Sequence, residues 1–245
     1  MIGSLYNVIF DVADVPRLGA FYQTLTGWRI RNDDPGFTVL QLPDGRRVSL
    51  QPAPEHVPPG WPDPDHPQQM HLDLLVPDHE AAASRAVELG ATRLAATEAE
   101  GSAWVTLADP AGHPFDLCRR EGAGDGVAEP MGMFAITIDT DEPGPLGRFY
   151  ADLLGMSVQW EGEPGVLVGN DAATVMFQKV ERYVRPQWPD PASSLQAHLD
   201  VDVADVDEAE RQVLALGASR VPGEGEDFRV YTDPSGHPFC LIFQP

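Results

Sequence analysis

The 245-residue chain has few cysteines, few basic residues and no long apolar run. Its two cysteines, Cys118 and Cys240, do not indicate a disulfide framework, and such scarcity is typical of a reducing compartment. No apolar run approaches the ~20 residues that a membrane-spanning helix needs. The first residues also do not resemble a signal peptide. The sequence therefore predicts a cytoplasmic protein.

Basic residues are outnumbered, with 16 Lys and Arg against 38 Asp and Glu and a formal net charge of -22. This charge would repel phosphate backbones and anionic lipid surfaces, which argues against nucleic acid and membranes as partners. A hydrophobic fraction of 42% indicates a folded globular protein rather than a disordered one. We therefore interpret the acidity as a surface property that favours solubility.

One stretch of the sequence occurs twice: residues 109–117, Asp-Pro-Ala-Gly-His-Pro-Phe-Asp-Leu, return as residues 233–241, Asp-Pro-Ser-Gly-His-Pro-Phe-Cys-Leu. Asp-Pro-x-Gly has turn chemistry, so a strand is expected to follow each copy. Alternation along the strand turns the Phe and Leu of each copy to one face and Asp116 or Cys240 to the other. We therefore expect the binding or catalytic side chains to lie on the second face.

The chain around these copies divides into four repeats of the order β-α-β-β-β. In the first repeat we expect a strand over 5–12, a helix capped by Asp14 and ended by Gly27, and short strands near 28–31, 37–42 and 47–51. In the second we expect a strand over 70–76, a helix over 79–89, and strands near 92–95, 103–107 and 114–118. The predicted core residues of this repeat are Leu72, Leu74, Val76, Phe115 and Leu117.

The repeats predict an α+β protein of two domains. Residues 122–126 are Gly-rich and indicate a boundary. Neighbouring repeats are expected to pair, giving an N-terminal domain over 1–122 from modules 1–52 and 68–120. A C-terminal domain over 131–245 would then consist of modules 131–180 and 195–245.

These features together resemble the glyoxalase/bleomycin resistance/dioxygenase superfamily, also called the vicinal oxygen chelate (VOC) superfamily. The matching pieces are Asp14 before a helix that contains Phe21 and Tyr22, His71 before a Val-Pro-Asp segment, and both Asp-Pro-x-Gly turns. The His-Leu-Asp form is most similar to the glyoxalase-like branch. The resemblance implies curved mixed sheets that form cups, with divalent-metal ligands from the first and last strands of each module.

Carried over by position, the resemblance implies two sets of cup residues. The first cup would offer Asn7, Gln51 or Ser49, His71 and Asp116, of which His71, Asp116 and Gln51 would be the metal ligands. The second cup would offer Ala135, Gln178 or Met176, His198 and Cys240. The candidate ligand-binding residues are Asn7, Asp73, Trp104, His198, Gln178, Phe228 and Cys240.

Two functions follow from the resemblance, and the catalytic residues stay unassigned under both. The first is binding of a small organic molecule without a metal, as in bleomycin resistance protein-like members. The alternative is a glyoxalase-type lyase or isomerase that uses a divalent ion (Ni, Zn, Mn, Mg or Fe) and an oxygen-chelating substrate. His71 and His198 would serve either function, or would only form structural hydrogen bonds. Both a monomer and a homodimer are compatible with four modules in one chain.

Overall fold

The computed structural model describes residues 1–31, 37–60, 66–94, 102–120, 130–188 and 196–244. Within these ranges the chain is α+β, with four helices and two eight-stranded mixed sheets, which confirms the expected fold class. The predicted boundary at 122–126 lies outside the described residues. None of the described helices is long and apolar enough to cross a membrane.

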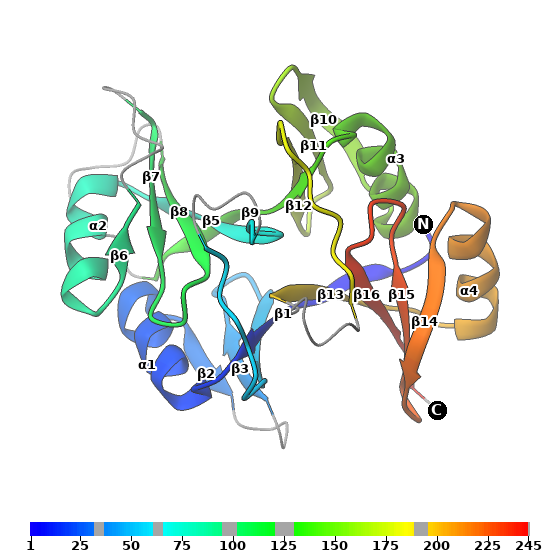
Figure 1. Cartoon of the computed structure of the whole chain (residues 1–245), viewed down its shortest axis with the longest axis horizontal. Helices are drawn as coiled ribbons and strands as arrows, with labels where there is room; N and C mark the ends of the chain where they lie inside the picture. Colours follow the sequence, from blue (N-terminus) through cyan, green and yellow to red (C-terminus); the bar gives the residue numbers. More distant parts are fainter. Residues whose placement is uncertain (32–36, 61–65, 95–101, 121–129, 189–195, 245) are drawn as a thin grey trace.

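The β-α-β-β-β order occurs four times (Figure 1). The first module comprises β1 (Ser4–Val12), α1 (Val15–Thr26), β2 (Arg29–Arg31), β3 (Thr38–Gln41) and β4 (Arg47–Pro52). The second comprises β5 (Met70–Val76), α2 (His79–Glu88), β6 (Thr92–Arg93), β7 (Trp104–Ala108) and β8 (Pro114–Arg119). The third comprises β9 (Gly132–Thr140), α3 (Pro143–Leu154), β10 (Ser157–Gly162), β11 (Gly165–Gly169) and β12 (Thr174–Lys179). The fourth comprises β13 (Ala197–Asp202), α4 (Val206–Ala215), β14 (Ser219–Glu224), β15 (Phe228–Thr232) and β16 (Pro238–Ile242).

Local chemistry sets the ends of the helices. The Asp14 side chain accepts a hydrogen bond from the Arg17 backbone N–H and so caps the start of α1. Gly27 ends α1 in the left-handed conformation, at φ 73°, and Gly155 ends α3 in the same way, at φ 63°. Asp14 and Gly27 are the cap and the terminator that the sequence predicts for α1.

The two sheets join modules from opposite halves of the chain. Sheet A has the strand order β14-β15-β16-β13-β1-β4-β3-β2, and sheet B has the order β10-β11-β12-β9-β5-β8-β7-β6. The first module therefore shares a sheet with the fourth and the second with the third, whereas the expected pairs are the first with the second and the third with the fourth. The reason is that β1 pairs antiparallel with β13, and β5 pairs antiparallel with β9.

Figure 1 shows α1 and α2 on one side of the molecule and α3 and α4 on the other, with β1, β5, β9 and β13 between them. The strands that join the halves are the first strands of the four modules. The domain limits 1–122 and 131–245 stay predictions.

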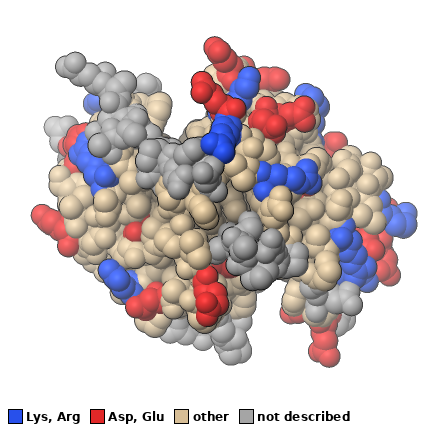
Figure 2. Space-filling model, in the orientation of Figure 1, with Lys and Arg blue, Asp and Glu red and all other residues tan. Residues whose placement is uncertain are grey.

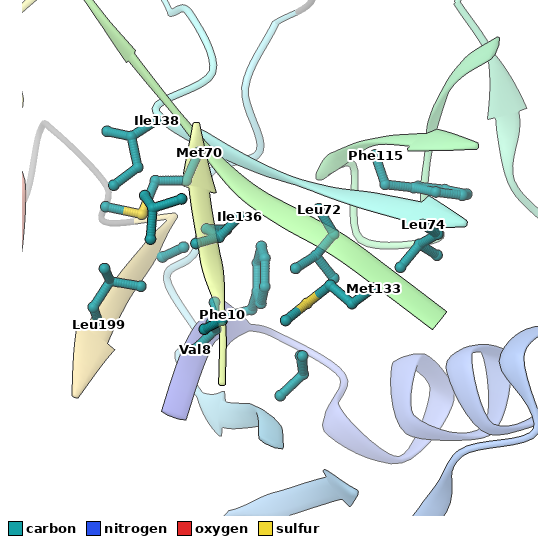
Figure 3. Close-up of a cluster of buried hydrophobic side chains, with 14 of the residues drawn as sticks. Val8, Phe10, Met70, Leu72, Leu74, Phe115, Met133, Ile136, Ile138 and Leu199 are labelled. Atoms are coloured by element: carbon teal, nitrogen blue, oxygen red, sulfur yellow. The ribbon is translucent and has the colours of Figure 1, made fainter. Parts of the chain in front are cut away.

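The apolar faces of the two sheets contribute to one core. Figure 3 shows Phe10 of β1, Leu72 of β5, Ile136 of β9 and Leu199 of β13 gathered in one cluster. The five predicted core residues of the second module are buried, which confirms the faces assigned to β5 and β8. The alternate residues of the same strands therefore point away from the core.

Charged side chains lie outside this core. Figure 2 shows Asp and Glu in several separate groups on one face of the molecule, with Lys and Arg beside many of them. On this face the acidic side chains are thus dispersed, as expected for a charge that favours solubility.

We predict that Phe115→Ala lowers the free energy of unfolding by about 3 to 5 kcal/mol, because truncating a buried Phe leaves a cavity. The Phe115 ring is fully buried, and its centroid lies 6.1 Å from that of Phe21. Urea unfolding measures the change, with the exposed Val87→Ala in α2 as the control. A loss below about 1 kcal/mol would contradict the assigned core.

Candidate functional sites on the two sheets

Polar side chains on the faces away from the core form two sets that the repeat relates to each other. We call the set on sheet A site A; its residues are Asn7, Ser49, Gln51, His198, Asp200, Phe228 and Cys240. We call the set on sheet B site B; its residues are His71, Asp73, Trp104, Asp116, Thr137 and Gln178. Each site takes strands from both halves because each sheet does.

Site B brings one imidazole and two carboxylates together. His71 Nε2 lies 3.5 Å from Asp73 Oδ1 and 3.8 Å from Asp116 Oδ2. Thr137 Oγ1 donates a 2.6 Å hydrogen bond to the other Asp73 oxygen. Asp116 Oδ1 is buried and has no hydrogen-bond partner among the described residues. One ligand atom from each of His71, Asp73 and Asp116 lies within 4.8 Å of the others, a donor set that suits a divalent ion.

The charges at site B act on one another. Burial acts to lower the pKa of His71, but the charges of Asp73, Asp116 and Asp139 together outweigh it and leave that pKa above its ordinary value. Burial raises the pKa of Asp73 to about 6, although His71 acts in the opposite direction. Burial also raises the pKa of Asp139, which lies near the same imidazole. The site therefore favours one positive charge among its carboxylates, either a proton on His71 or a bound cation.

Site A differs from site B at the position of its second acid. His198 Nε2 lies 3.7 Å from Asp200 Oδ1, a pair that corresponds to His71 and Asp73 in site B. The third residue of the group is Cys240, which stands in the place of Asp116. On the neighbouring strands, Asn7 Nδ2 donates a 2.8 Å hydrogen bond to Ser49 Oγ. Site A therefore offers a carboxylate, an imidazole, a thiol and an amide.

A cavity of about 420 Å³ opens at site A. Its polar border includes His198, Asp200 and Cys240, and its aromatic border includes Phe37 and Phe228. The border also carries the carboxylates of Asp202 and Asp227, so aromatic surface and hydrogen-bonding groups meet in one cavity. The volume is typical of small-molecule sites.

Burial dominates the protonation of site A. It lowers the pKa of His198 to about 4, so this imidazole is neutral near pH 7. Burial, together with the nearby Asp200 carboxylate, also raises the pKa of the Cys240 thiol. Both groups are therefore neutral hydrogen-bonding groups near pH 7, and the thiol is not activated as a nucleophile.

The structure separates the predicted metal ligands. His71 and Asp116 lie together in site B, but Gln51 lies in site A, where its Nε2 donates a 2.5 Å hydrogen bond to Asp11 Oδ1. The predicted trio of His71, Asp116 and Gln51 is therefore divided between the two sheets, because β4 belongs to sheet A and β5 and β8 belong to sheet B. The role of these residues as metal ligands stays a prediction. Asp73 takes the third place beside His71.

The predicted ligand-binding residues are divided between the sheets. Four of them border the cavity of site A: Asn7, His198, Phe228 and Cys240. The other three, Asp73, Trp104 and Gln178, lie on sheet B. Trp104 is 45% exposed, and Gln178 Nε2 lies 3.3 Å from Asp139 Oδ1. Their roles in binding stay predictions.

Three residues in or beside these sites were not among the predicted site residues. Asp200 completes the group at site A, while Thr137 and Asp139 adjoin His71 at site B. The repeated His-Leu-Asp at 71–73 and 198–200 indicates Asp200, and the match between Asp11 and Asp139 at equivalent positions of two modules indicates Asp139. Thr137 carries no such signal, because Ile9 stands at its position in the first module.

Comparison with known proteins agrees with the expected resemblance. A family model described as a glyoxalase-like domain matches residues 7–118 and again 135–242. No curated protein matches the chain. The family match therefore rests on both halves of the sequence.

Several solved structures share the fold. Glyoxalase I from Zea mays is 17% identical, with a TM-score of 0.63, over 98% of this chain and 92% of that chain. A putative dioxygenase from Bacillus subtilis is 16% identical, with a TM-score of 0.62, over 100% of this chain and 86% of that chain. The cppA protein from Streptococcus pneumoniae is 10% identical, with a TM-score of 0.52, over the whole of both chains. At these identities the likeness shows the fold alone.

We predict that the imidazole of His71 titrates at a higher pH than that of His198, because only His71 lies near two carboxylates. NMR of the imidazole protons in chelator-treated protein measures both pKa values, with His71→Gln and His198→Gln for assignment. Asp116→Asn should lower the pKa of His71, whereas Asp152→Asn on the exposed surface of α3 should not. Equal pKa values for the two imidazoles, or no response to Asp116→Asn, would contradict this picture.

Proposed function

Because this chain belongs to the glyoxalase-like domain family, we propose that it binds a small organic molecule at site A. The observation that supports the proposal is the cavity of about 420 Å³ with its aromatic border and convergent polar groups. Apolar and aromatic walls supply most of the binding free energy in such pockets, and the polar groups fix orientation. A planar organic molecule with hydrogen-bonding groups fits this border.

Each side chain has a distinct part in the proposed binding. Phe37 and Phe228 provide aromatic surface against a planar group. Neutral His198 borders the cavity and can donate or accept a hydrogen bond with the ligand at a ring nitrogen. The Asp200 carboxylate accepts a hydrogen bond from an O–H or N–H of the ligand. This binding requires no metal ion.

A fragment library of planar aromatic compounds tests the proposal by ligand-observed NMR on the full chain. The test variant is Phe228→Ala, and Trp104→Ala is the matched control because Trp104 stands at the equivalent position on sheet B. We expect compounds that bind at micromolar to millimolar concentration and lose about tenfold in affinity in Phe228→Ala only, since lost aromatic contact costs on the order of 1.4 kcal/mol.

Two outcomes would count against binding at site A. One is that no compound of the library binds the unaltered protein. The other is a set of bound compounds whose dissociation constants are the same in the unaltered protein and in Phe228→Ala.

A second candidate function is binding of a divalent ion at site B, as in the metal-dependent reading of the family. It is favoured by the His71, Asp73 and Asp116 group, whose one imidazole and two carboxylates fit a borderline or hard ion. An ion there would act as a Lewis acid on a ligand oxygen. Thr137 would orient Asp73 through its hydrogen bond, as supporting groups do around metal sites.

Calorimetric titration of the full chain with Mn²⁺ and Zn²⁺ tests this candidate. Asp116→Asn should weaken binding by about tenfold or more, because it removes an anionic ligand. Cys240→Ser at the equivalent position of site A is the matched control and should leave the affinity unchanged. Binding should also weaken as the pH falls through the pKa of His71, since a protonated imidazole has no lone pair to donate. Equal losses in both variants, or none in Asp116→Asn, would exclude site B.

A further inference from the structure

A second cavity, of about 670 Å³, lies where the two halves of the chain meet, and we call it the junction groove. Its border includes Tyr6 of β1, Met133 and Phe134 of β9, Leu75 of β5, and Arg47 of β4. Tyr6 also borders the cavity of site A, but the other four residues named here do not. The volume falls within the range of small-molecule sites.

Two β-bulges aim aromatic side chains at the junction groove. The register of β1 with β13 shifts between Leu5 and Asn7, which leaves Tyr6 as the extra residue. The register of β9 with β5 shifts at the equivalent place and leaves Phe134 as the extra residue. Tyr6 is 41% exposed and Phe134 is 40% exposed. Bulges turn a side chain out of the normal alternation, so both halves present an aromatic ring to the same groove.

Arg47 supplies a positive charge at this groove. Its guanidinium carbon lies 4.6 Å from the centre of the Tyr6 ring, and its Nη1 donates a hydrogen bond to the Tyr6 hydroxyl. The adjacent Arg46 pairs with Asp44 at 2.7 Å, whereas Arg47 makes no ion pair with a described residue. A guanidinium has five N–H donors, and Tyr6 takes one of those of Arg47. Basic residues are few in this chain of net charge -22, and this half-buried guanidinium has N–H donors left with which to bind an anion.

The second half of the chain does not reproduce this charge. Thr174 stands at the position of Arg47, and its hydroxyl donates a hydrogen bond to the Phe134 carbonyl oxygen. Beside it, the border includes Met156 and Ala173 together with the polar Asn170 and the exposed Asp171. At the first-half end Asp44 is paired with Arg46, so the guanidinium of Arg47 is the positive charge there without a carboxylate partner among the described residues, and the other end lacks a basic side chain among its described residues.

We propose that the junction groove binds a small organic acid with a planar apolar body. Its carboxylate pairs with the guanidinium of Arg47, which matches a carboxylate in shape and charge. Its apolar body contacts Phe134 and Met133, where aromatic and sulfur-containing side chains favour a planar ligand. The junction groove shares Tyr6 with the cavity of site A, but Arg47, Phe134 and Met133 border the groove alone.

Calorimetric titration of the full chain with trans-cinnamate tests the proposal. We expect binding that weakens about tenfold or more in both Arg47→Gln and Phe134→Ala, since a charge-assisted pair and an aromatic contact each contribute on the order of 1.4 kcal/mol. Neutral cinnamamide, which has the same shape, should bind about tenfold more weakly than cinnamate to the unaltered protein. Raised salt should reduce the difference between them.

Three variants make the test specific. Arg29→Gln on the exposed strand β2 removes a charge elsewhere and should leave cinnamate binding unchanged. Phe228→Ala should also leave it unchanged, because Phe228 belongs to site A, where the carboxylates of Asp200, Asp202 and Asp227 repel an anion. Arg47→Lys keeps the charge without the planar fork, so it should bind cinnamate with intermediate affinity. Thermal unfolding of each variant checks that it is folded as the unaltered protein is.

Three results would overturn the proposal. The first is the absence of cinnamate binding to the unaltered protein. The second is equal affinity for cinnamate in the unaltered protein and in folded Arg47→Gln. The third is loss of binding in Phe228→Ala with full retention in Phe134→Ala, which would assign the acid to site A.

Discussion

The antiparallel pairing of first strands, β1 with β13 and β5 with β9, is the interaction on which the rest of the structure depends. Each of these strands already pairs on its other edge with the last strand of its own module. The remaining edge carries unpaired backbone groups that need a partner. By meeting across the halves, the four strands form two continuous sheets and decide which side chains share a site.

The repeat places site A and site B on similar strands, and single residues make the chemistry of the two sites different. His71 and His198 stand at equivalent positions, each two residues before an Asp, yet their pKa values are shifted in opposite directions. Asp116 adds a second negative charge beside His71, whereas Cys240 adds a neutral thiol beside His198. Site B is therefore suited to a cation and site A to a neutral organic ligand, and this difference underlies the two functions that we propose.

Irregularities in the same strands create a further surface. A bulge at Tyr6 and another at Phe134 break the alternation that otherwise turns side chains toward the core or toward a site. Because the two strands lie in different sheets, only the packing of the sheets places both rings at one groove with Arg47. The groove that we propose for an organic acid thus depends on local irregularity and on global pairing together.

The sequence by itself determined the module order, the cap and terminator of α1, and the buried faces of β5 and β8, because these depend on local turn chemistry and alternation. It also predicted that His71 and Asp116 lie near each other, because both belong to the second module on strands that pair in parallel. Only the tertiary structure decided that Gln51 lies elsewhere and that modules pair across the halves. The four modules present equivalent edge strands with the same alternating pattern, so either pairing satisfies the same backbone hydrogen bonds, and nothing local distinguishes them.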